Sequence, residues 1–109
     1  MIFGFAALLL AAQAAPADIA GTWDLIWQTR HGPSRGGWLV VTRQGSRIAA
    51  EIHGRGAVKA KGEITGADFI LRGSRLAIPY TISGRLEGNG LEGSLKILSI
   101  DRRFTGTRR

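Results

Sequence analysis

At 109 residues the chain has room for one domain at most, and a composition of 44% hydrophobic and 21% charged residues excludes wholesale disorder. The formal net charge of +7 favours anionic partners such as lipid phosphates, acidic polysaccharide or nucleic acid. The chain has no cysteine, which excludes a disulfide framework, a thiol nucleophile and a lipoprotein anchor, so stability must come from a closed and well-packed core.

The first segment reads MIFGFAALLLAAQAAP and is apolar from Ile2 to Ala12. This run is shorter than the roughly 20 residues that span a bilayer, and it ends in a small-x-small site at Ala12-Gln13-Ala14. It predicts a signal peptide over 1–14, a single domain over 15–109, and a periplasmic or secreted location. Export argues against nucleic acid as the physiological partner. A buried amino-terminal helix is the alternative interpretation.

After this segment, short runs of alternating apolar and polar residues are separated by turns that contain glycine. Alternation with period two predicts half-buried strands. The sixth of these runs is expected to turn Leu76, Ile78, Tyr80 and Ile82 toward the core. The eight predicted strands cover residues 19–30, 37–43, 47–53, 57–65, 68–73, 75–87, 91–99 and 102–108.

Short connections favour a meander in which strands adjacent in sequence pair in space. Asn89-Gly90 is the residue pair typical of a two-residue type I′ turn. Eight strands dispose of their free edges best when the first pairs with the last. The predicted fold is therefore all-β, an eight-stranded antiparallel up-and-down β-barrel that follows a signal segment.

Gly21-Thr22-Trp23, at the start of the first strand, resembles the opening motif of the calycin-type barrels, the lipocalins and the avidin/streptavidin group. The resemblance implies that Trp23 closes one end of a small barrel and that an arginine at the end of the last strand covers its ring. Arg108 is the expected partner, with Arg109 as substitute. The polar residues that hold biotin have no counterpart in DLIWQTRHG, so biotin binding does not carry over.

In such a barrel the odd-numbered connections share one end, and most of the arginines fall there. We expect this end to be an open, basic mouth that takes a small amphipathic anion such as a fatty acid, or an anionic envelope surface. The apolar part would enter past Trp27, Phe69 and Tyr80. The mouth arginines are Arg30, Arg35, Arg55, Arg72, Arg75, Arg102 and Arg103; the predicted ligand-binding set takes from them Arg30, Arg35, Arg72, Arg75 and Arg102.

The sequence offers little for catalysis, and we expect a binding protein with no cofactor rather than an enzyme. The two histidines, His31 and His53, lack the spacing of a metal site. Glu51 and His53 could form an acid–base pair, but their alternation with apolar residues favours a pair on the outer surface.

The run GGWLVVT is expected to place Trp38 and Val40 on the outer face beside Ile26, as a surface for homo-oligomer formation or a partner protein. The alternative register would turn Trp38 inward. Two further functions stay open. One is a protein-interaction module such as a secreted-protease inhibitor, acting through this patch or the first loop, TRHGPSRGG; the other is a small-barrel enzyme of the cyclase type.

Overall fold

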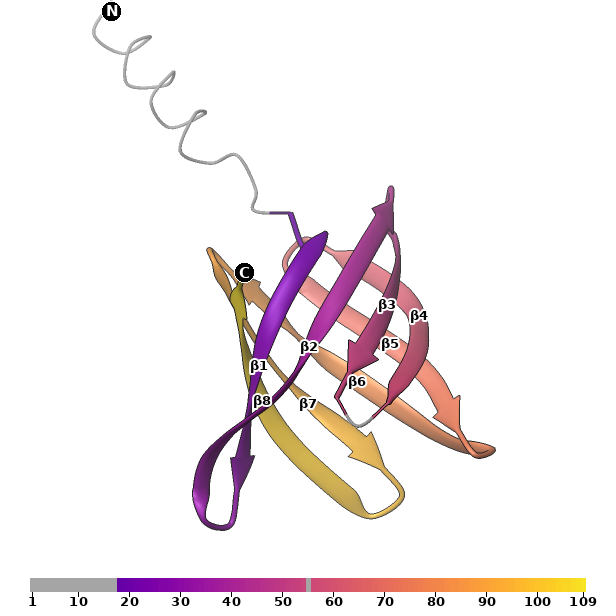
Figure 1. The fold of residues 1–109 in the computed structure, drawn as a ribbon. Coiled ribbons are helices and arrows are strands. Elements are labelled where there is room, and N and C mark those ends of the chain that lie inside the picture. Colours follow the sequence, from indigo (N-terminus) through magenta and orange to yellow (C-terminus); the bar gives the residue numbers. More distant parts are fainter. Residues whose placement is uncertain (1–17, 55) are drawn as a thin grey trace, which may run out of the picture.

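The computed structural model describes residues 18–54 and 56–109, and these residues form eight antiparallel strands with no helix (Figure 1). The predicted signal segment, 1–14, and Arg55 lie outside the described residues, and what was expected of them stays a prediction. The strands are β1 (Gly21–Thr29), β2 (Gly32–Gln44), β3 (Arg47–His53), β4 (Ala57–Thr65), β5 (Asp68–Arg75), β6 (Ile78–Glu87), β7 (Gly90–Ile97) and β8 (Ile100–Arg108).

Each strand pairs with the next, and β8 pairs with β1, so the sheet closes into a barrel. The closing seam runs from Trp23 opposite Arg108 to Trp27 opposite Phe104. Six of the seven connections have two residues, which leaves sequence neighbours no choice but to pair antiparallel. The predicted eight-stranded up-and-down barrel is confirmed.

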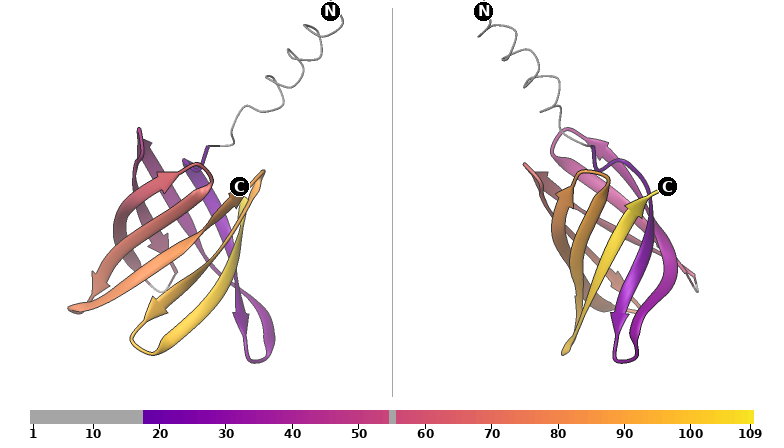
Figure 2. Two further views of the ribbon diagram at one scale, coloured as in Figure 1. Left: turned by 180° about the vertical axis from the view of Figure 1, so that it is seen from behind. Right: turned by 90° about the vertical axis from the view of Figure 1, so that its left-hand side faces the viewer.

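The connections alternate between the two ends of the barrel. We call the mouth the end formed by the β1–β2, β3–β4, β5–β6 and β7–β8 connections, and the plugged end the one formed by the other three. The C-terminus lies at the plugged end (Figures 1 and 2), and Asp18 lies there too, because its carbonyl accepts a hydrogen bond from Arg108 at the end of β8. There the Arg109 N–H donates a hydrogen bond to the Thr22 carbonyl at 2.9 Å, which ties the chain end to β1.

Alternate residues along each strand face inward and fill the barrel with aliphatic and aromatic side chains. The most completely enclosed side chains are Trp23, Ile19, Leu39 and Leu71. Within the part of the chain that the structure describes, no polar or charged side chain is fully buried. The interior is therefore a packed core over most of its length, as the absence of disulfides requires.

Three local predictions are wrong. Leu76 and Ile78, both expected in the core, are 88% and 37% exposed. The alternating pattern runs straight through a two-residue turn that contains Leu76, and Ile78 is the first residue of β6 after that turn. The β6–β7 turn is centred on Gly88 and Asn89 rather than Asn89 and Gly90; Gly88 takes the left-handed φ of +60°, as the first central position of a type II′ turn requires. The first loop has two residues, because β2 begins at Gly32 instead of residue 37.

Candidate functional site

The plugged end is closed by Trp23, whose side chain is fully buried. The indole N–H donates to the Ile19 carbonyl at 2.9 Å, and the Arg108 guanidinium lies 4.2 Å from the ring centroid. Arg108 also donates to the carbonyls of Ala20, at 3.0 Å, and Asp18. These contacts hold the segment before β1 across the end of the barrel, and they confirm the tryptophan–arginine pair that the calycin resemblance implies. The described residues therefore close this end of the barrel.

Gly21, the glycine of the opening motif, is favoured by the local backbone conformation and by the close approach of Arg108. Gly21 has a φ of +136°, and a Cβ placed there would come within 2.9 Å of Nη1 of Arg108. A larger residue at this position would therefore displace the guanidinium from the Trp23 ring.

The mouth contains a cavity of about 180 Å³ whose lining combines apolar side chains and glycines with two basic residues, His53 and Arg75. Trp27 stands on one side, with Ile52 and Val58 on the neighbouring wall and Arg75 at the rim. The Trp27 indole N–H donates to the Gly36 carbonyl at 2.8 Å, and its ring lies 5.1 Å from that of Phe104, centroid to centroid. The indole is thus fixed as a wall of the cavity.

Tyr80 lies deeper in the mouth half of the barrel and is buried. Its hydroxyl donates to the Lys59 carbonyl at 2.8 Å, and its ring end lies against Gly73, where a Cβ would be 2.5 Å from the hydroxyl oxygen. Burial raises the pKa of the Tyr80 phenol above its usual range. The tyrosine and the buried side chains of Leu71 and Ile82 fill the lumen, so the cavity ends as a shallow cup.

A β-bulge at the mouth decides where Arg35 points. Asp24 pairs with Trp38 and Ile26 with Arg35, so two glycines of β2 stand opposite one residue of β1. Gly37 has a φ of +76°, and a Cβ there would collide with the His53 carbonyl oxygen. The bulge shifts the alternation by one residue and turns Arg35 to the outer wall beside Ile26.

The remaining predicted ligand-binding residues are divided by the structure. Arg75 and Trp27 meet at the cavity, while Arg30 lies in the adjoining β1–β2 turn. Arg102 is exposed, opposite Leu95 and in the same alternation as Phe104, so it is at the inner side of the rim.

Two of the predicted ligand-binding residues, Arg72 and Phe69, lie outside the mouth. Arg72 alternates with the buried Phe69 and Leu71, so it is on the outer wall. Phe69 follows the β4–β5 turn, at the plugged end, where it is buried opposite Ile64. The alternation of strand residues could have placed Arg72 on the outer wall from the sequence, and the position of Phe69 directly after the β4–β5 turn could have placed it at the plugged end. Assigning residues to the mouth by their nearest loop alone could not.

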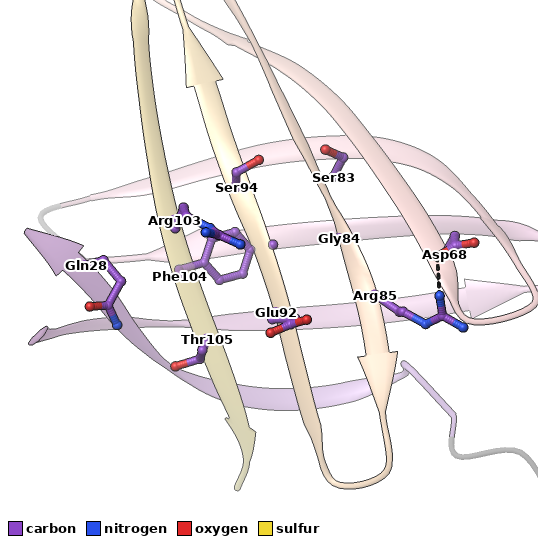
Figure 3. Close-up of a pocket in the computed structure, with 11 residues that line it drawn as sticks. Gln28, Asp68, Ser83, Gly84, Arg85, Glu92, Ser94, Arg103, Phe104 and Thr105 are labelled. Atoms are coloured by element: carbon purple, nitrogen blue, oxygen red, sulfur yellow. Dashed lines mark ion pairs between the residues drawn. The ribbon is translucent and has the colours of Figure 1, made fainter.

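A second hollow, of about 400 Å³, lies on the outer wall across β5 to β8 and the end of β1 (Figure 3). Small outward side chains at Ser83 and Ser94 leave it open. Its charged lining is mixed: Arg85 pairs with Asp68 at 3.9 Å, on the far side of the hollow from Gln28, and Glu92 and Arg103 line it as well (Figure 3). A wall with equal numbers of acidic and basic groups does not select an anion. The mouth is the better candidate.

The outer face carries a ring stack. Trp38 is 36% exposed and stacks on His53 with centroids 5.0 Å apart, and the Arg109 guanidinium lies 5.3 Å from the Trp38 centroid. The His53 Nε2 is 3.2 Å from a Glu51 carboxylate oxygen, both side chains being partly exposed, so this pair is on the surface as expected. The inward register for Trp38 is excluded.

Sequence reasoning missed four exposed aliphatic residues at the mouth, Leu76, Ile78, Leu98 and Ile100. The signal was present: each hairpin has a leucine where a tight turn favours glycine or asparagine. Among residues 18–54 and 56–109, no three histidine or carboxylate side chains gather into a metal-binding group. The same residues include no helix with the length and apolar character to cross a membrane.

No family model matches this chain, and no curated protein sequence does either. Among solved structures, the chain is similar to one described as "REP1-NXSQ fatty acid transporter". The TM-score is 0.53 at 12% sequence identity, and the likeness covers 84% of this chain and 96% of the other. This likeness concerns the fold, which is consistent with a calycin-like barrel.

Proposed function

We propose that this protein is an exported, non-enzymatic binding module of the lipocalin/avidin-like kind, which takes an amphipathic anion such as a fatty acid, or an anionic envelope surface, at the mouth. The observation that carries the proposal is the pairing of an apolar cup with Arg75 at its rim. An apolar tail would contact Trp27, Ile52 and Val58 while the carboxylate meets the guanidinium. The neighbour in fold is named as a fatty acid transporter, which supports a lipid ligand.

The size of the cup limits what enters. Ligand pockets commonly measure about 300–1,000 Å³, whereas this cavity holds about 180 Å³. That volume is close to the ~150 Å³ engineered cavity that accepts a benzene ring. A short stretch of alkyl chain fits, and a longer chain must leave part of its length outside the cup or displace Tyr80.

The test is isothermal titration calorimetry with laurate, using dodecanol as the uncharged comparison. Arg75→Glu should weaken laurate binding roughly tenfold or more, because an attraction becomes a repulsion. Arg72→Glu is the matched control: it makes the same change of net charge on the same strand but on the outer wall. Equal loss in both variants would reduce the effect to the overall field of the protein, and absence of laurate binding to the unmodified chain would refute the proposal.

A second candidate is a protein-interaction module such as an inhibitor of a secreted protease. The stack of Trp38 on His53, with Arg109 above it, presents an aromatic and a cation on the outer wall, the residue types enriched in interface hot spots. Trp38→Ala should then abolish complex formation with the partner and leave laurate binding unchanged. The same patch, with Ile26 and Val40, is where we place a homo-oligomer contact.

A further inference from the structure

Two hairpins at the mouth expose aliphatic side chains that the core does not use. Leu76 is 88% exposed and Ile78 37% exposed at the β5–β6 hairpin, and Leu98 is 77% and Ile100 53% exposed at the β7–β8 hairpin. The only other large hydrophobic residue exposed in the described chain is Trp38. The hairpins are adjacent, since β6 pairs with β7, and that pairing stops at Tyr80 opposite Ile97. The β5–β6 tip therefore extends beyond the last β6–β7 pair.

The backbone at these tips is unfavourable for leucine. Leu76 and Leu98 have φ values of +53° and +55°, in the left-handed region. At the plugged end the corresponding turn positions are glycines, Gly45, Gly66 and Gly88, with φ between +60° and +62°. The fold would be served better by glycine at both tips. The leucines bring no buried contact in return, so an external apolar partner is the physical reason we infer for them.

Basic side chains flank both tips. Arg75 directly precedes Leu76, and Arg102 and Arg103 follow Ile100 on β8. The acidic group in this region, Asp101, stands opposite Lys96. Aliphatic tips with arginines set just behind them match a bilayer surface, in which apolar groups enter the acyl boundary and guanidiniums remain with lipid phosphates.

We propose that the β5–β6 and β7–β8 tips dock the barrel, mouth first, on a bilayer that contains anionic phospholipid. The proposal deepens the envelope-surface part of the proposed function and rests on it for the class of partner, but its residues are outside the cup. Four aliphatic side chains give a shallow and reversible contact, so the arginines are needed as well. Docking in this orientation presents the Arg75 rim to the lipid surface.

The test uses the lack of cysteine in the full chain to place one fluorescent reporter at a time. Ser99→Cys, next to Leu98, receives the environment-sensitive label NBD, and Ser46→Cys carries the same label at the plugged end as the control. The probes are vesicles of phosphatidylcholine with and without phosphatidylglycerol. The expected result is a blue shift and rise in emission at position 99 with the anionic vesicles, absent with neutral vesicles and at position 46.

A second arm separates docking from folding. Leu76→Gly combined with Leu98→Gly should abolish the signal at position 99 without lowering the melting temperature, since glycine suits both turns. Arg103→Glu should weaken the signal at least severalfold, and Arg47→Glu at the plugged end should not. A response at position 46 but not 99, an equal response to neutral vesicles, or an unchanged response in the glycine variant would overturn the proposal. Laurate binding in the glycine variant should persist, so failure of docking and failure of the cup are distinguishable.

Discussion

Trp23→Ala is the perturbation that tests the plugged end most directly. It removes a fully buried indole, the hydrogen bond from that ring to Ile19, and the surface on which the Arg108 guanidinium lies 4.2 Å from the ring centroid. The substitution leaves a void between the inner walls of β1 and the segment that precedes it. Arg108 keeps its hydrogen bonds to the Ala20 and Asp18 carbonyls but loses the indole ring against which its guanidinium packs.

The magnitude follows from these losses. Truncation of a core tryptophan to alanine destabilises proteins by about 3–5 kcal/mol, and a cation on an indole face contributes about 0.5–2 kcal/mol of such a total. Small domains have about 5–15 kcal/mol of stability in all. At about 4–8 °C per kcal/mol, the melting temperature should fall by at least about 12 °C, and a marginal domain would unfold.

Urea and thermal unfolding, followed by far-ultraviolet circular dichroism, measure this loss. Trp38→Ala is the control, because its ring is on the outer wall and its removal should change stability by only about 1 kcal/mol or less. A double-mutant cycle of Trp23→Ala with Arg108→Met should give a coupling of about 0.5–2 kcal/mol. A Trp23→Ala protein with an unchanged melting temperature, or a coupling near zero, would refute this account of the plug.

Four other outcomes are expected. Burial raises the folded pKa of Tyr80 above its unfolded value of about 10, so the unfolded state loses this proton first. The free energy of unfolding should therefore fall as pH rises above about 10. Tyr80 is the only tyrosine, so phenolate absorbance at alkaline pH reports it alone, and Tyr80→Phe should remove that part of the alkaline loss. Leu98→Gly should raise the free energy of unfolding by about 0.5–1 kcal/mol in urea titrations, since relief of left-handed strain exceeds the added chain entropy. Gly62→Ala should lower it by about 1–3 kcal/mol, because a Cβ meets the backbone of β5, whereas Gly54→Ala, with open space around it, should have little effect. Intact-mass measurement of protein recovered from the periplasm or medium should show cleavage after Ala14, and a species that retains the first residue would refute export.

Local alternation determined most of the architecture. The ranges of β3 and β4 match the prediction, because each has a clear period of two between turn residues. The same pattern predicted Trp23 in the core and favoured Trp38 on the outer wall, with the inward register as the alternative, since residues of an uninterrupted strand alternate between faces. The short connections then predicted a meander. The Gly-Thr-Trp motif, together with an arginine at the chain end, predicted that Trp23 closes one end of the barrel.

The tertiary structure alone decided the details of the mouth. Arg35 points outward because two glycines bulge opposite Leu25, an event that depends on close contact between β2 and the His53 backbone. Leu76 could not be separated from the core by pattern, because a two-residue turn preserves the alternation while it carries the side chain into solvent. The cup likewise depends on closure of the barrel, because Trp27, Ile52, Val58 and Arg75, which line it, come from four different strands. Periodicity specifies the face on which a side chain lies, whereas the space left inside a closed barrel depends on every strand at once.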